Sequence, residues 1–485
     1  MSRSDNILSR IDWPTILMFL GLVIFGWLNI YAAGYNYEQT SIFDFTNRAG
    51  KQFVWILTAL VMGGIILILD EKIYDILAYL MYAGLIILLF ITPFLAHEVK
   101  GSLSWINLGS ISLQPAEFAK VITALAVAKY MGRYEYKLRS WRDLIIPFAL
   151  IGAPMLIIMI LQRETGSALV LTAFLLVFYR KGMSGYVLWI CALAVALFII
   201  VIRFGQAPLP IGSGSMGMFV SWMMILTIML YFVHQNHRKP LYSLIIIGFI
   251  VLIYAISLIL CIWVKVNFNW VSLGVIILLI GYIGYMTIRF RKWQMLFVVL
   301  FAICSIGYTQ ACDWVFQKVL QAHQRSRIEV LLGIKDDPSG VGYNVNQSRI
   351  AIGSGRFSGK GYLQGTQTKL KYVPEQDTDF IFCTIGEEWG FVGSVAVLVI
   401  YLCFILRIIH IAERQRNEYS QIYGYAVASI FLFHLTINIG MVLGLLPVIG
   451  IPLPFFSYGG SSLWGFTILL FILLKLDAVR DEQLH

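Results

Sequence analysis

Apolar residues form long runs along this chain, and polar residues gather in the stretches between them. Most runs are about 17 to 25 residues long, the length that a helix needs to cross the hydrocarbon core of a bilayer. The pattern predicts an all-α, polytopic membrane helix bundle of about fourteen transmembrane helices. Their centres lie near residues 23, 61, 84, 122, 152, 173, 195, 225, 253, 279, 304, 398, 434 and 467.

One long polar segment, residues 315–386, interrupts this pattern between the eleventh and twelfth spans. Its stretch 340–361 is rich in Gly but interleaved with Ile, Val and Phe, which favours an ordered loop lying on the helices over a free linker. The predicted organisation is N-terminal membrane helices over residues 1–204, further membrane helices over 205–300, and C-terminal membrane helices with the large loop over 301–485.

Composition supports the membrane class, and charge adds an orientation. Hydrophobic residues make up 59% and charged residues 13%, against roughly 45–50% and 25% in soluble domains. Excess Lys and Arg in short connections marks the cytoplasmic side. The net charge of +10 is therefore compatible with basic cytoplasmic loops, and the distribution of these basic residues places both termini in the cytoplasm and the loop 315–386 outside. The predicted cytoplasmic connections are 70–72, 129–143, 179–185, 234–240, 289–293 and 413–420.

Ionisable residues lie inside two predicted spans. Glu117 and Lys120 are three residues apart, so on a helix they share a face and can form an ion pair. Ionisable residues at membrane depth are candidates for function, although a purely structural ion pair is the alternative. His434 and Asn438 are four residues apart, and hydrogen bonding to neighbouring helices is the favoured interpretation for them.

Polar or irregular elements converge on the predicted outer face. The stretch GLLPVIGIPLPFFSYGGSS (444–462) has three prolines and four glycines, and irregular backbone at membrane depth is tolerated where protein buries it or a cavity adjoins it. The run YVPEQDTDFIF (372–382) carries Asp377 and Asp379 at the end of the loop. Taken alone, Asp379 is better explained as an acid at the N-cap or in the first turn of the following helix. With Gln162–Glu164, these elements indicate a site that faces the exterior.

Three stretches resemble one protein family: residues 342–367, PEQDTDFIF (374–382) and residues 438–462. They are similar to the SEDS proteins (shape, elongation, division and sporulation), bacterial polytopic glycosyltransferases that polymerise the peptidoglycan precursor lipid II. GSGRFSGKGYLQGTQ (353–367) and GIPLPFFSYGGSS (450–462) resemble RodA, the elongation member, more than FtsW, the division member. The resemblance implies a multi-pass protein of the bacterial cytoplasmic membrane that acts in cell elongation and cell-wall synthesis.

The chain departs from the family pattern in three places. The family usually has ten spans, so about four helices are expected to be inserted between residues 205 and 300. Ser104 stands in GSLSWINLG (101–109) where the family commonly has Arg before Trp. The run Gln162-Arg163-Glu164 replaces the usual Gln-Pro-Asp. These departures put the roles of the last two positions in doubt.

The resemblance implies that Asp379 is the essential acid. It would act as general base on the 4-hydroxyl of the acceptor sugar, while undecaprenyl pyrophosphate leaves from C1 of the growing strand. On chemistry alone Asp377 remains an alternative. The developing negative charge on the pyrophosphate needs cations. The expected substrate-binding residues are Glu117, Lys120, Arg349, Lys360, Gln367 and Ser457, with Ser457, Gly459 and Gly460 shaping the backbone near the cavity.

The resemblance also implies particular partners. These are lipid II, a class B penicillin-binding protein that supplies the transpeptidase, and other membrane proteins of the elongation machinery, without nucleic acid. A divalent cation, Mg²⁺ or Mn²⁺, is compatible with the pyrophosphate, but no metal site is evident in the sequence. Two rival functions stay open: a lipid II flippase, which would place its site near the bilayer midplane, and a non-catalytic scaffold of the elongation machinery.

Overall fold

The computed structural model describes residues 10–35, 41–99, 101–109, 111–133, 136, 141–236, 240–320, 322–335 and 342–480. Parts of the predicted connections 129–143 and 234–240, and of the Gly-rich stretch 340–361, lie outside the described residues. The chain divides into two compact units. Unit 1 combines residues 1–184 with 343–485, and unit 2 is residues 185–342. The three sections expected from the sequence, 1–204, 205–300 and 301–485, group the spans in chain order and not by packing. They stay a prediction.

The chain is an all-α, multi-pass membrane protein. Twelve helices of the described part are long and apolar enough to cross a membrane. The two other predicted spans correspond to helix α5 (Pro115–Met131), which has 17 residues, and to the shorter apolar stretch Thr165–Arg180. The total of fourteen therefore stays a prediction.

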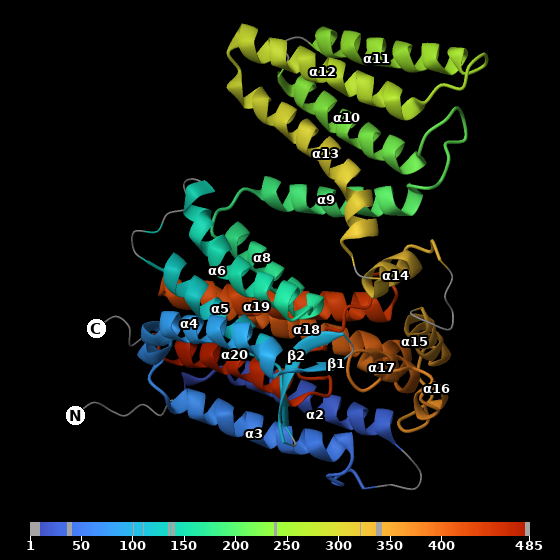
Figure 1. Cartoon of the computed structure of the whole chain (residues 1–485). Helices are drawn as coiled ribbons and strands as arrows, with labels where there is room; N and C mark the ends of the chain where they lie inside the picture. The colour runs from blue at the N-terminus through green and yellow to red at the C-terminus, as the bar shows by residue number, and fades with distance from the viewer. Residues whose placement is uncertain are drawn as a thin grey trace. The chain divides into compact units, whose positions relative to one another are not determined.

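Unit 1 is built from two segments that are distant in sequence (Figure 1). The first contains α2 (Trp13–Gly34), α3 (Arg48–Ile68), α4 (Glu71–Leu95), α5, η1 (Trp141–Leu144), α6 (Ile145–Leu156), the π-helical turn η2 (Ile157–Leu161), α7 (Thr165–Val170), η3 (Leu171–Ala173) and α8 (Phe174–Arg180). The second contains α15 (Tyr343–Ser354), α16 (Thr366–Lys369), α17 (Ile381–Glu388), α18 (Gly390–Glu413), α19 (Glu418–Val442) and α20 (Gly460–Ala478).

Side-chain caps mark where several long helices begin. Asp70 precedes α4 and accepts a hydrogen bond from the Lys72 amide at 2.9 Å. Asn417 precedes α19 and accepts one from the Tyr419 amide at 3.0 Å. Each cap satisfies an amide that has no partner within its own helix, and this fixes the first turn.

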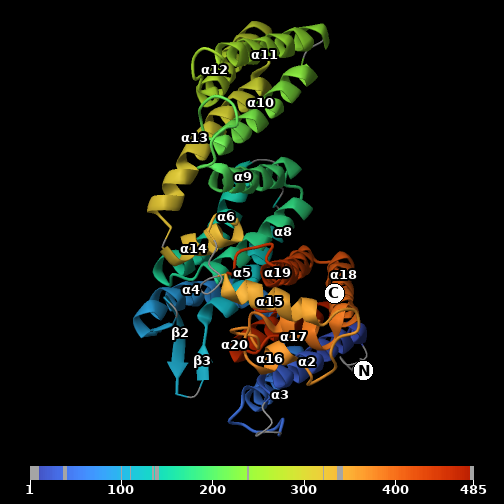
Figure 2. The ribbon, with the colours of Figure 1, turned by 90° about the vertical axis from the view of Figure 1, so that its right-hand side faces the viewer.

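The two segments of unit 1 interleave. Helix α20 packs against α3 and α5, and α19 packs against α5, α8 and α18. The short helices α15, α16 and α17 lie together, with α16 and α17 against α2 and with α15 against α19 (Figures 1 and 2). Residues 343–388 therefore form three short helices joined by turns, and these helices pack on the long helices of unit 1.

Three short strands, which the sequence analysis did not predict, follow α4 (Figures 1 and 2). Strands β1 (His97–Val99), β2 (Ser102–Leu108) and β3 (Ile111–Leu113) form an antiparallel sheet in the order β1-β2-β3. Gly101 and Gly109 adopt φ values of 87° and 68°, the left-handed conformation that glycine allows at tight turns. Because β2 packs against α4 and α5, the sheet is fixed to unit 1.

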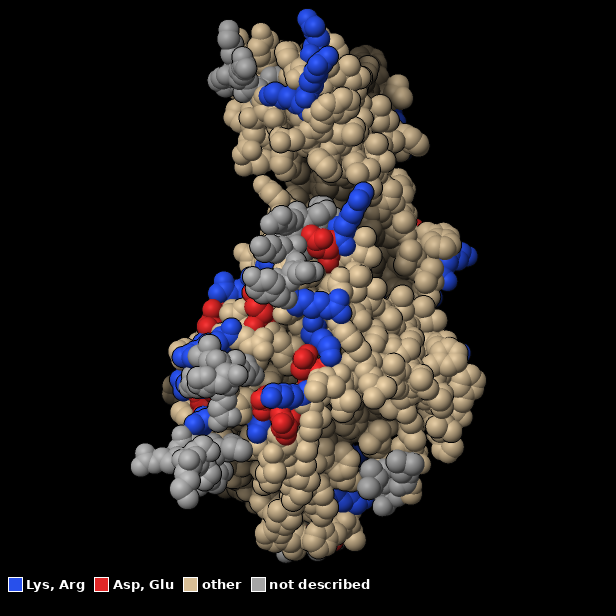
Figure 3. All heavy atoms as spheres, turned by 90° about the vertical axis from the view of Figure 1, so that its left-hand side faces the viewer, with Lys and Arg blue, Asp and Glu red and all other residues tan. Residues whose placement is uncertain are grey.

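Charged side chains of unit 1 gather at one set of helix ends, as Figure 3 shows for one face. Lys181 Nζ lies 3.0 Å from Glu418 Oε2, which joins the end of α8 to the start of α19. Lys129 Nζ lies 3.9 Å from Asp75 Oδ1, which joins the end of α5 to the first turns of α4. The predicted cytoplasmic connections 179–185 and 413–420 thus meet through an ion pair, and a second ion pair ties the start of 129–143 to α4.

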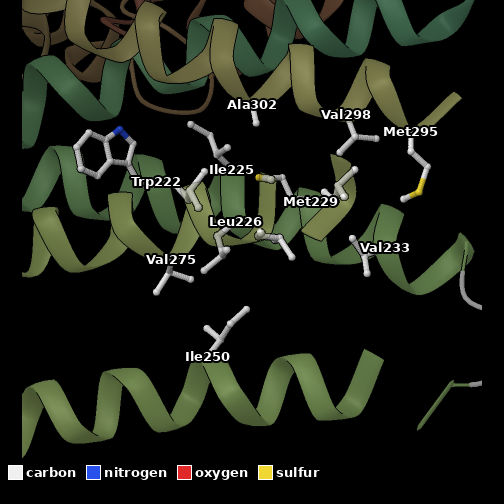
Figure 4. Close-up of a cluster of buried hydrophobic side chains, with 13 residues drawn as sticks. Trp222, Ile225, Leu226, Met229, Val233, Ile250, Val275, Met295, Val298 and Ala302 are labelled. Atoms are coloured by element: carbon white, nitrogen blue, oxygen red, sulfur yellow. The ribbon is translucent and has the colours of Figure 1, made fainter. Parts of the chain in front are cut away.

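Unit 2 has a core of apolar side chains. Helix α10 turns Trp222, Ile225, Met229 and Val233 to one side, at spacings of three and four residues (Figure 4). This spacing keeps them on one helical face, which packs against α12 and α13. The elements of unit 2 are α9 (Gly185–Phe204), α10 (Met216–Asn236), α11 (Pro240–Leu260), α12 (Phe268–Phe290), η4 (Trp293–Met295), α13 (Leu296–Lys318) and α14 (Ala322–Leu331).

Candidate active site

Asp379 lies in a turn just before α17. A Cβ built on Gly450 would lie 3.4 Å from Oδ2 of Asp379, so the carboxylate faces this glycine. The Asn438 amide group donates to the backbone oxygens of Asp379 at 2.9 Å and of Ile451 at 2.7 Å. The N-cap of α17 is Phe380, and the first turn of this helix contains no acid. The capping explanation for Asp379 is therefore wrong.

The irregular stretch between α19 and α20 is tied to the residues around Asp379. The Ser457 hydroxyl donates to the backbone oxygen of Thr378 at 2.7 Å and accepts from the Leu453 amide at 2.9 Å. The Tyr458 amide donates to the backbone oxygen of Asp377 at 2.9 Å. In a helix, these backbone groups would bond to one another. Here, the Ser457 side chain and the residues around Asp379 provide their hydrogen-bond partners instead.

Glu117 and Lys120 form the ion pair that their spacing predicts. Lys120 Nζ lies 2.7 Å from Glu117 Oε2, and the two residues are only 2% and 3% exposed. Lys120 Nζ also lies 3.1 Å from Nε2 of His434 and 4.3 Å from the centre of the Phe466 ring. A buried charge needs such partners to offset its lost hydration. Because the pair is enclosed by α5, α19 and α20, its contact with substrate stays a prediction.

Helix α19 links this buried ion pair to Asp379. His434 and Asn438 lie one turn apart. Nδ1 of His434 is 3.1 Å from the backbone oxygen of Pro452, and Asn438 donates to that of Ile451. The interpretation of these residues as hydrogen-bonding to neighbouring helices is confirmed for His434, which contacts Lys120 on α5, whereas the hydrogen-bond partners of Asn438 among the described residues lie in a turn and in the irregular stretch. Together the two side chains hold two consecutive carbonyl groups of the irregular stretch in place.

Lys360 and Gln367 lie in a separate cluster around Glu387, a residue that the sequence analysis did not identify. Lys360 Nζ lies 2.7 Å from Oε1 of Glu387, and the Gln367 amide donates to the same oxygen at 2.8 Å. The Thr366 amide also donates to Oε1, at 2.8 Å, and the Thr368 amide donates to Oε2 at 2.9 Å. Glu387 therefore pins the loop that carries these four residues, and a role in substrate binding stays a prediction.

The neighbouring acids Glu387 and Glu388 have opposite electrostatic environments. Burial favours the neutral form of Glu387, but hydrogen bonds from Lys360 and the loop amides outweigh it and lower the pKa of Glu387. Burial raises the pKa of Glu388 to about 7, and the amides of Leu363 and Gly365 counteract this rise only in part. These amides are near the carboxylate, but within the described residues neither oxygen of Glu388 accepts a hydrogen bond of normal distance and angle.

Arg349 is the exposed member of the three predicted phosphate-binding cations. Its helix α15 is anchored to the end of α19, because the Ser348 hydroxyl donates to the backbone oxygen of Val442 at 3.1 Å. A Cβ on Gly444 would lie 3.5 Å from Cδ of Arg349. The side chain of Arg349 is thus exposed, with its Cδ beside the start of the irregular stretch, whereas Lys120 is buried and Lys360 is paired.

The two family departures are in contact. The hydroxyl groups of Ser102 and Ser104 lie 2.7 Å and 3.2 Å from Oε2 of Glu164. The Leu103 amide donates to the backbone oxygen of Gln162 at 2.9 Å. Arg163 adopts a φ of 54°, which proline cannot reach. Strand β2 and the turn after η2 are therefore joined by side-chain and backbone hydrogen bonds.

Asp377 has a partner that sequence reasoning missed. Arg48 Nη1 lies 2.5 Å from Asp377 Oδ1. Both residues line a cavity of about 460 Å³ between the end of α2, the start of α3 and residues 371–377. The position of Arg48 at the start of an apolar run was the available signal, because a cation there needs an anion or water. Asp377 is thus committed to an ion pair.

The described residues contain no group of three or more His, Cys, Asp or Glu side chains that could hold a metal ion. A divalent cation at this site would therefore need oxygen ligands from another molecule, such as phosphate groups. Mg²⁺ commonly binds in this way, with one or two carboxylates and the substrate phosphates.

Comparison with known proteins identifies the family. The family model for FtsW, RodA and SpoVE, described as cell cycle protein, matches residues 12–209 and 216–482. The peptidoglycan glycosyltransferase RodA of Treponema pallidum (strain Nichols) is 31% identical over 482 residues, which are 97% of this chain and 98% of that protein. The peptidoglycan glycosyltransferase MrdB of Escherichia coli (strain K12) is 45% identical over 150 residues, 31% of this chain and 40% of that protein.

Two solved structures share the fold. One is described as structural coordination of polymerization and crosslinking by a peptidoglycan synthase complex, with a TM-score of 0.61 and 21% identity over 97% of this chain and 98% of that chain. The other is a point mutant of the rod shape determining protein RodA of Thermus thermophilus, with a TM-score of 0.53 and 19% identity over the same shares. The chain therefore belongs to the FtsW/RodA/SpoVE family of cell cycle proteins.

Proposed function

We propose that this protein is a peptidoglycan glycosyltransferase that polymerises lipid II into glycan strands during cell elongation. The RodA of Treponema pallidum, whose match covers 97% of this chain, is named a peptidoglycan glycosyltransferase. In the reaction, the 4-hydroxyl oxygen of the acceptor sugar bonds to C1 of the donor. The bond from C1 to undecaprenyl pyrophosphate breaks, and the hydroxyl proton goes to Asp379.

The position of Asp379 carries the proposal. Its backbone is held by Asn438, and its half-buried carboxylate faces Gly450. A general base must be fixed within hydrogen-bond reach of the proton that it takes. A carboxylate also stabilises the positive charge that develops on the sugar ring in glycosyl transfer. Asp377, committed to Arg48, is the weaker candidate.

Arg349 is the cation best placed for the leaving pyrophosphate, because its side chain is exposed beside the irregular stretch. Lys120 acts through the buried network around His434, and Lys360 through the loop that Glu387 holds. Gln367 and Ser457 bind the substrate or shape its surroundings. A divalent cation, Mg²⁺ or Mn²⁺, would neutralise pyrophosphate oxygens when bound.

The lipid substrate sets the location. We place the protein in the bacterial cytoplasmic membrane, with both termini cytoplasmic and Asp379 at the outer face, because short basic connections favour the cytoplasm. The undecaprenyl tail then stays in the bilayer while the sugars reach Asp379. Crosslinking falls to a class B penicillin-binding protein docked near the last helices and the outer loop, in line with the synthase complex whose fold this chain shares.

The decisive experiment compares wild type with Asp379→Asn, using fluorescent lipid II and purified protein, alone and with the penicillin-binding partner. The expected result is glycan ladders from wild type and a loss of at least about a hundredfold in the variant, because the asparagine cannot accept the proton. Glu98→Gln, an exposed acid on β1, is the matched control. Ladders from folded Asp379→Asn at the wild-type rate would exclude Asp379 as the base and turn attention to Asp377.

The same preparation separates the rival functions. A flippase would move lipid II between leaflets of a vesicle without making polymer, and a scaffold would do neither. No ladder from wild type with its partner and Mg²⁺ present would overturn the proposed activity.

A further inference from the structure

We infer that Glu164 is a positioning residue for the active site, and that it acts as one unit with the hydroxyl groups of Ser102 and Ser104. The inference rests on the proposed function and deepens it. It concerns how Asp379 is kept in place by parts of the chain that precede it by more than two hundred residues.

The first step is the hydrogen bonding of Glu164. Oε2 of Glu164 lies 2.7 Å from Oγ of Ser102 and 3.2 Å from Oγ of Ser104, and the two serine oxygens are 2.7 Å apart. Ser104 is completely buried. Hydrogen bonds to a carboxylate are roughly twice as strong as those between neutral groups. Strand β2 therefore fixes the side chain of Glu164.

The second step runs from Glu164 toward the irregular stretch. Gly166 lies two residues further along, at the start of α7. A Cβ built on Gly166 would come within 2.9 Å of the backbone oxygen of Ile449 and 3.4 Å of Cγ1 of Ile451. This approach is closer than any side chain allows, so only glycine lets the two backbones meet here. The turn that Glu164 anchors is therefore in direct contact with residues 449–451.

The third step reaches Asp379. Gly450 lies between the two residues that Gly166 contacts, and its Cβ position is 3.4 Å from Oδ2 of Asp379. Asn438 joins the backbone oxygen of Ile451 to that of Asp379. A shift of the turn at Glu164 would thus move the surface against which the carboxylate of Asp379 rests.

The chemistry of the two departures supports the pairing. Where the resemblance leads one to expect Arg and Asp, the chain has Ser104 and Glu164, a shorter side chain at one position and a longer one at the other. Glu reaches one methylene further than Asp, and the Ser104 hydroxyl donates a hydrogen bond to its carboxylate at 3.2 Å. Because the two residues touch, we expect a change at one position to alter the effect of a change at the other.

The test is a mutant cycle on lipid II polymerisation by the purified protein. Glu164→Gln and the double variant Ser102→Ala/Ser104→Ala should each lower kcat about ten- to hundredfold with KM unchanged, since each removes hydrogen bonds to a charged group. The triple variant should lower kcat no more than whichever of these two variants has the lower kcat. Ser112→Ala is the control, because Ser112 is exposed on the edge strand β3 and, among the described contacts, its hydroxyl bonds to Asn107 alone.

Two further variants keep the inference testable if Glu164→Gln fails to fold. Gly166→Ala should lower kcat to a similar extent, because its Cβ displaces residues 449–451. The swap Ser104→Arg/Glu164→Asp should recover activity to within about fivefold of wild type, whereas Glu164→Asp alone should not.

Multiplicative losses in the cycle, or full activity of Gly166→Ala, would overturn the inference while leaving the glycosyltransferase intact. A wild-type protein that makes no polymer would instead count against the proposed function. Unfolding temperature and elution profile, measured for each variant, distinguish a lower kcat from a smaller folded fraction.

Discussion

Unit 1 and unit 2 bury different kinds of side chain. In the most apolar stretch of α20, in unit 1, 83% of the residues are buried, against 11% for α11 in unit 2. Unit 1 buries Glu117, Lys120 and Glu387. Among the described residues of unit 2, the buried polar side chains are serines and threonines. A buried charge is costly unless it is paired. The comparison therefore indicates that the interior of unit 1 depends on paired charges, as a functional site would require, whereas the interior of unit 2 depends on apolar packing.

The largest effect on stability is expected from Lys120→Met. The substitution leaves the carboxylate of Glu117 buried without its cation, and breaking a buried pair in this way costs about 3–5 kcal/mol. The double variant Glu117→Gln/Lys120→Met removes both charges and should be more stable than the single variant. Denaturant unfolding of the purified protein in detergent measures both. A single variant as stable as the double would show that the unpaired Glu117 carboxylate does not destabilise the fold. The difference between the units in their dependence on paired charges would then be smaller than proposed.

The next effect is a pH dependence that belongs to Glu388. Its pKa is raised from 4.5 to about 7 in the folded protein, so between these values the folded state holds a proton that the unfolded state has lost. Stability should therefore fall by about 3 kcal/mol as the pH rises from 4.5 to 7, and then level off. Glu387 has the opposite sign, because its lowered pKa means that its contribution is lost only as the solution becomes more acidic.

The measurement is the unfolding temperature between pH 5 and 8. Glu388→Gln should flatten the curve, whereas Glu98→Gln on exposed β1 should leave the wild-type slope. An equal slope in wild type and Glu388→Gln would assign the pH dependence to other groups.

A smaller effect is expected in the core of unit 2. Ile276→Ala leaves a cavity at a fully buried position and should cost about 1–3 kcal/mol, at the lower end of such substitutions because lipid tails are as apolar as the core. Ile277→Ala, at a position 57% exposed, is the control. Polymerisation per folded molecule should be unchanged in both, and a loss of kcat in Ile276→Ala would mean that unit 2 contributes to the chemistry.

The smallest effect is expected for Glu329→Gln on α14. Its carboxylate lies 3.8 Å from Arg325 Nε, with side chains 26% and 38% exposed. Exposed pairs of this kind contribute about 0–1 kcal/mol. The unfolding free energy should therefore change by less than about 0.5 kcal/mol, and a larger loss would show that unit 2 also depends on charge.

The long helices were predictable because their signal is local. A run of about 20 apolar residues determines a spanning helix wherever its neighbours lie. The pairing of Glu117 with Lys120 was predictable for the same reason, since one helical turn sets their distance. The strands β1, β2 and β3 were missed, because β1 and β3 have three residues each and their pairing follows from two glycine turns and contact with α4.

The site was predictable only where a motif carried it. Asp379 was identified through its motif, and its position beside Gly450 is consistent with that role, which stays a prediction. Glu387 was missed because its donors come from a loop about 20 residues away, and no pattern along the chain records such contacts. Arg48 was missed for a similar reason, since its partner Asp377 is 329 residues distant. Long-range pairing of polar groups is a property of the packed structure.

The discontinuity of unit 1 has a consequence for biosynthesis. His434 follows Lys120 by 314 residues, and at about 5–20 residues per second the ribosome needs roughly 15–60 s to make that stretch. During this interval α5 resides in the membrane or its insertion machinery without α19 and α20. Glu117 lies one turn from Lys120 on the same helix. The charge of Lys120 is therefore paired within α5 from the start, before α19 and α20 have been synthesised.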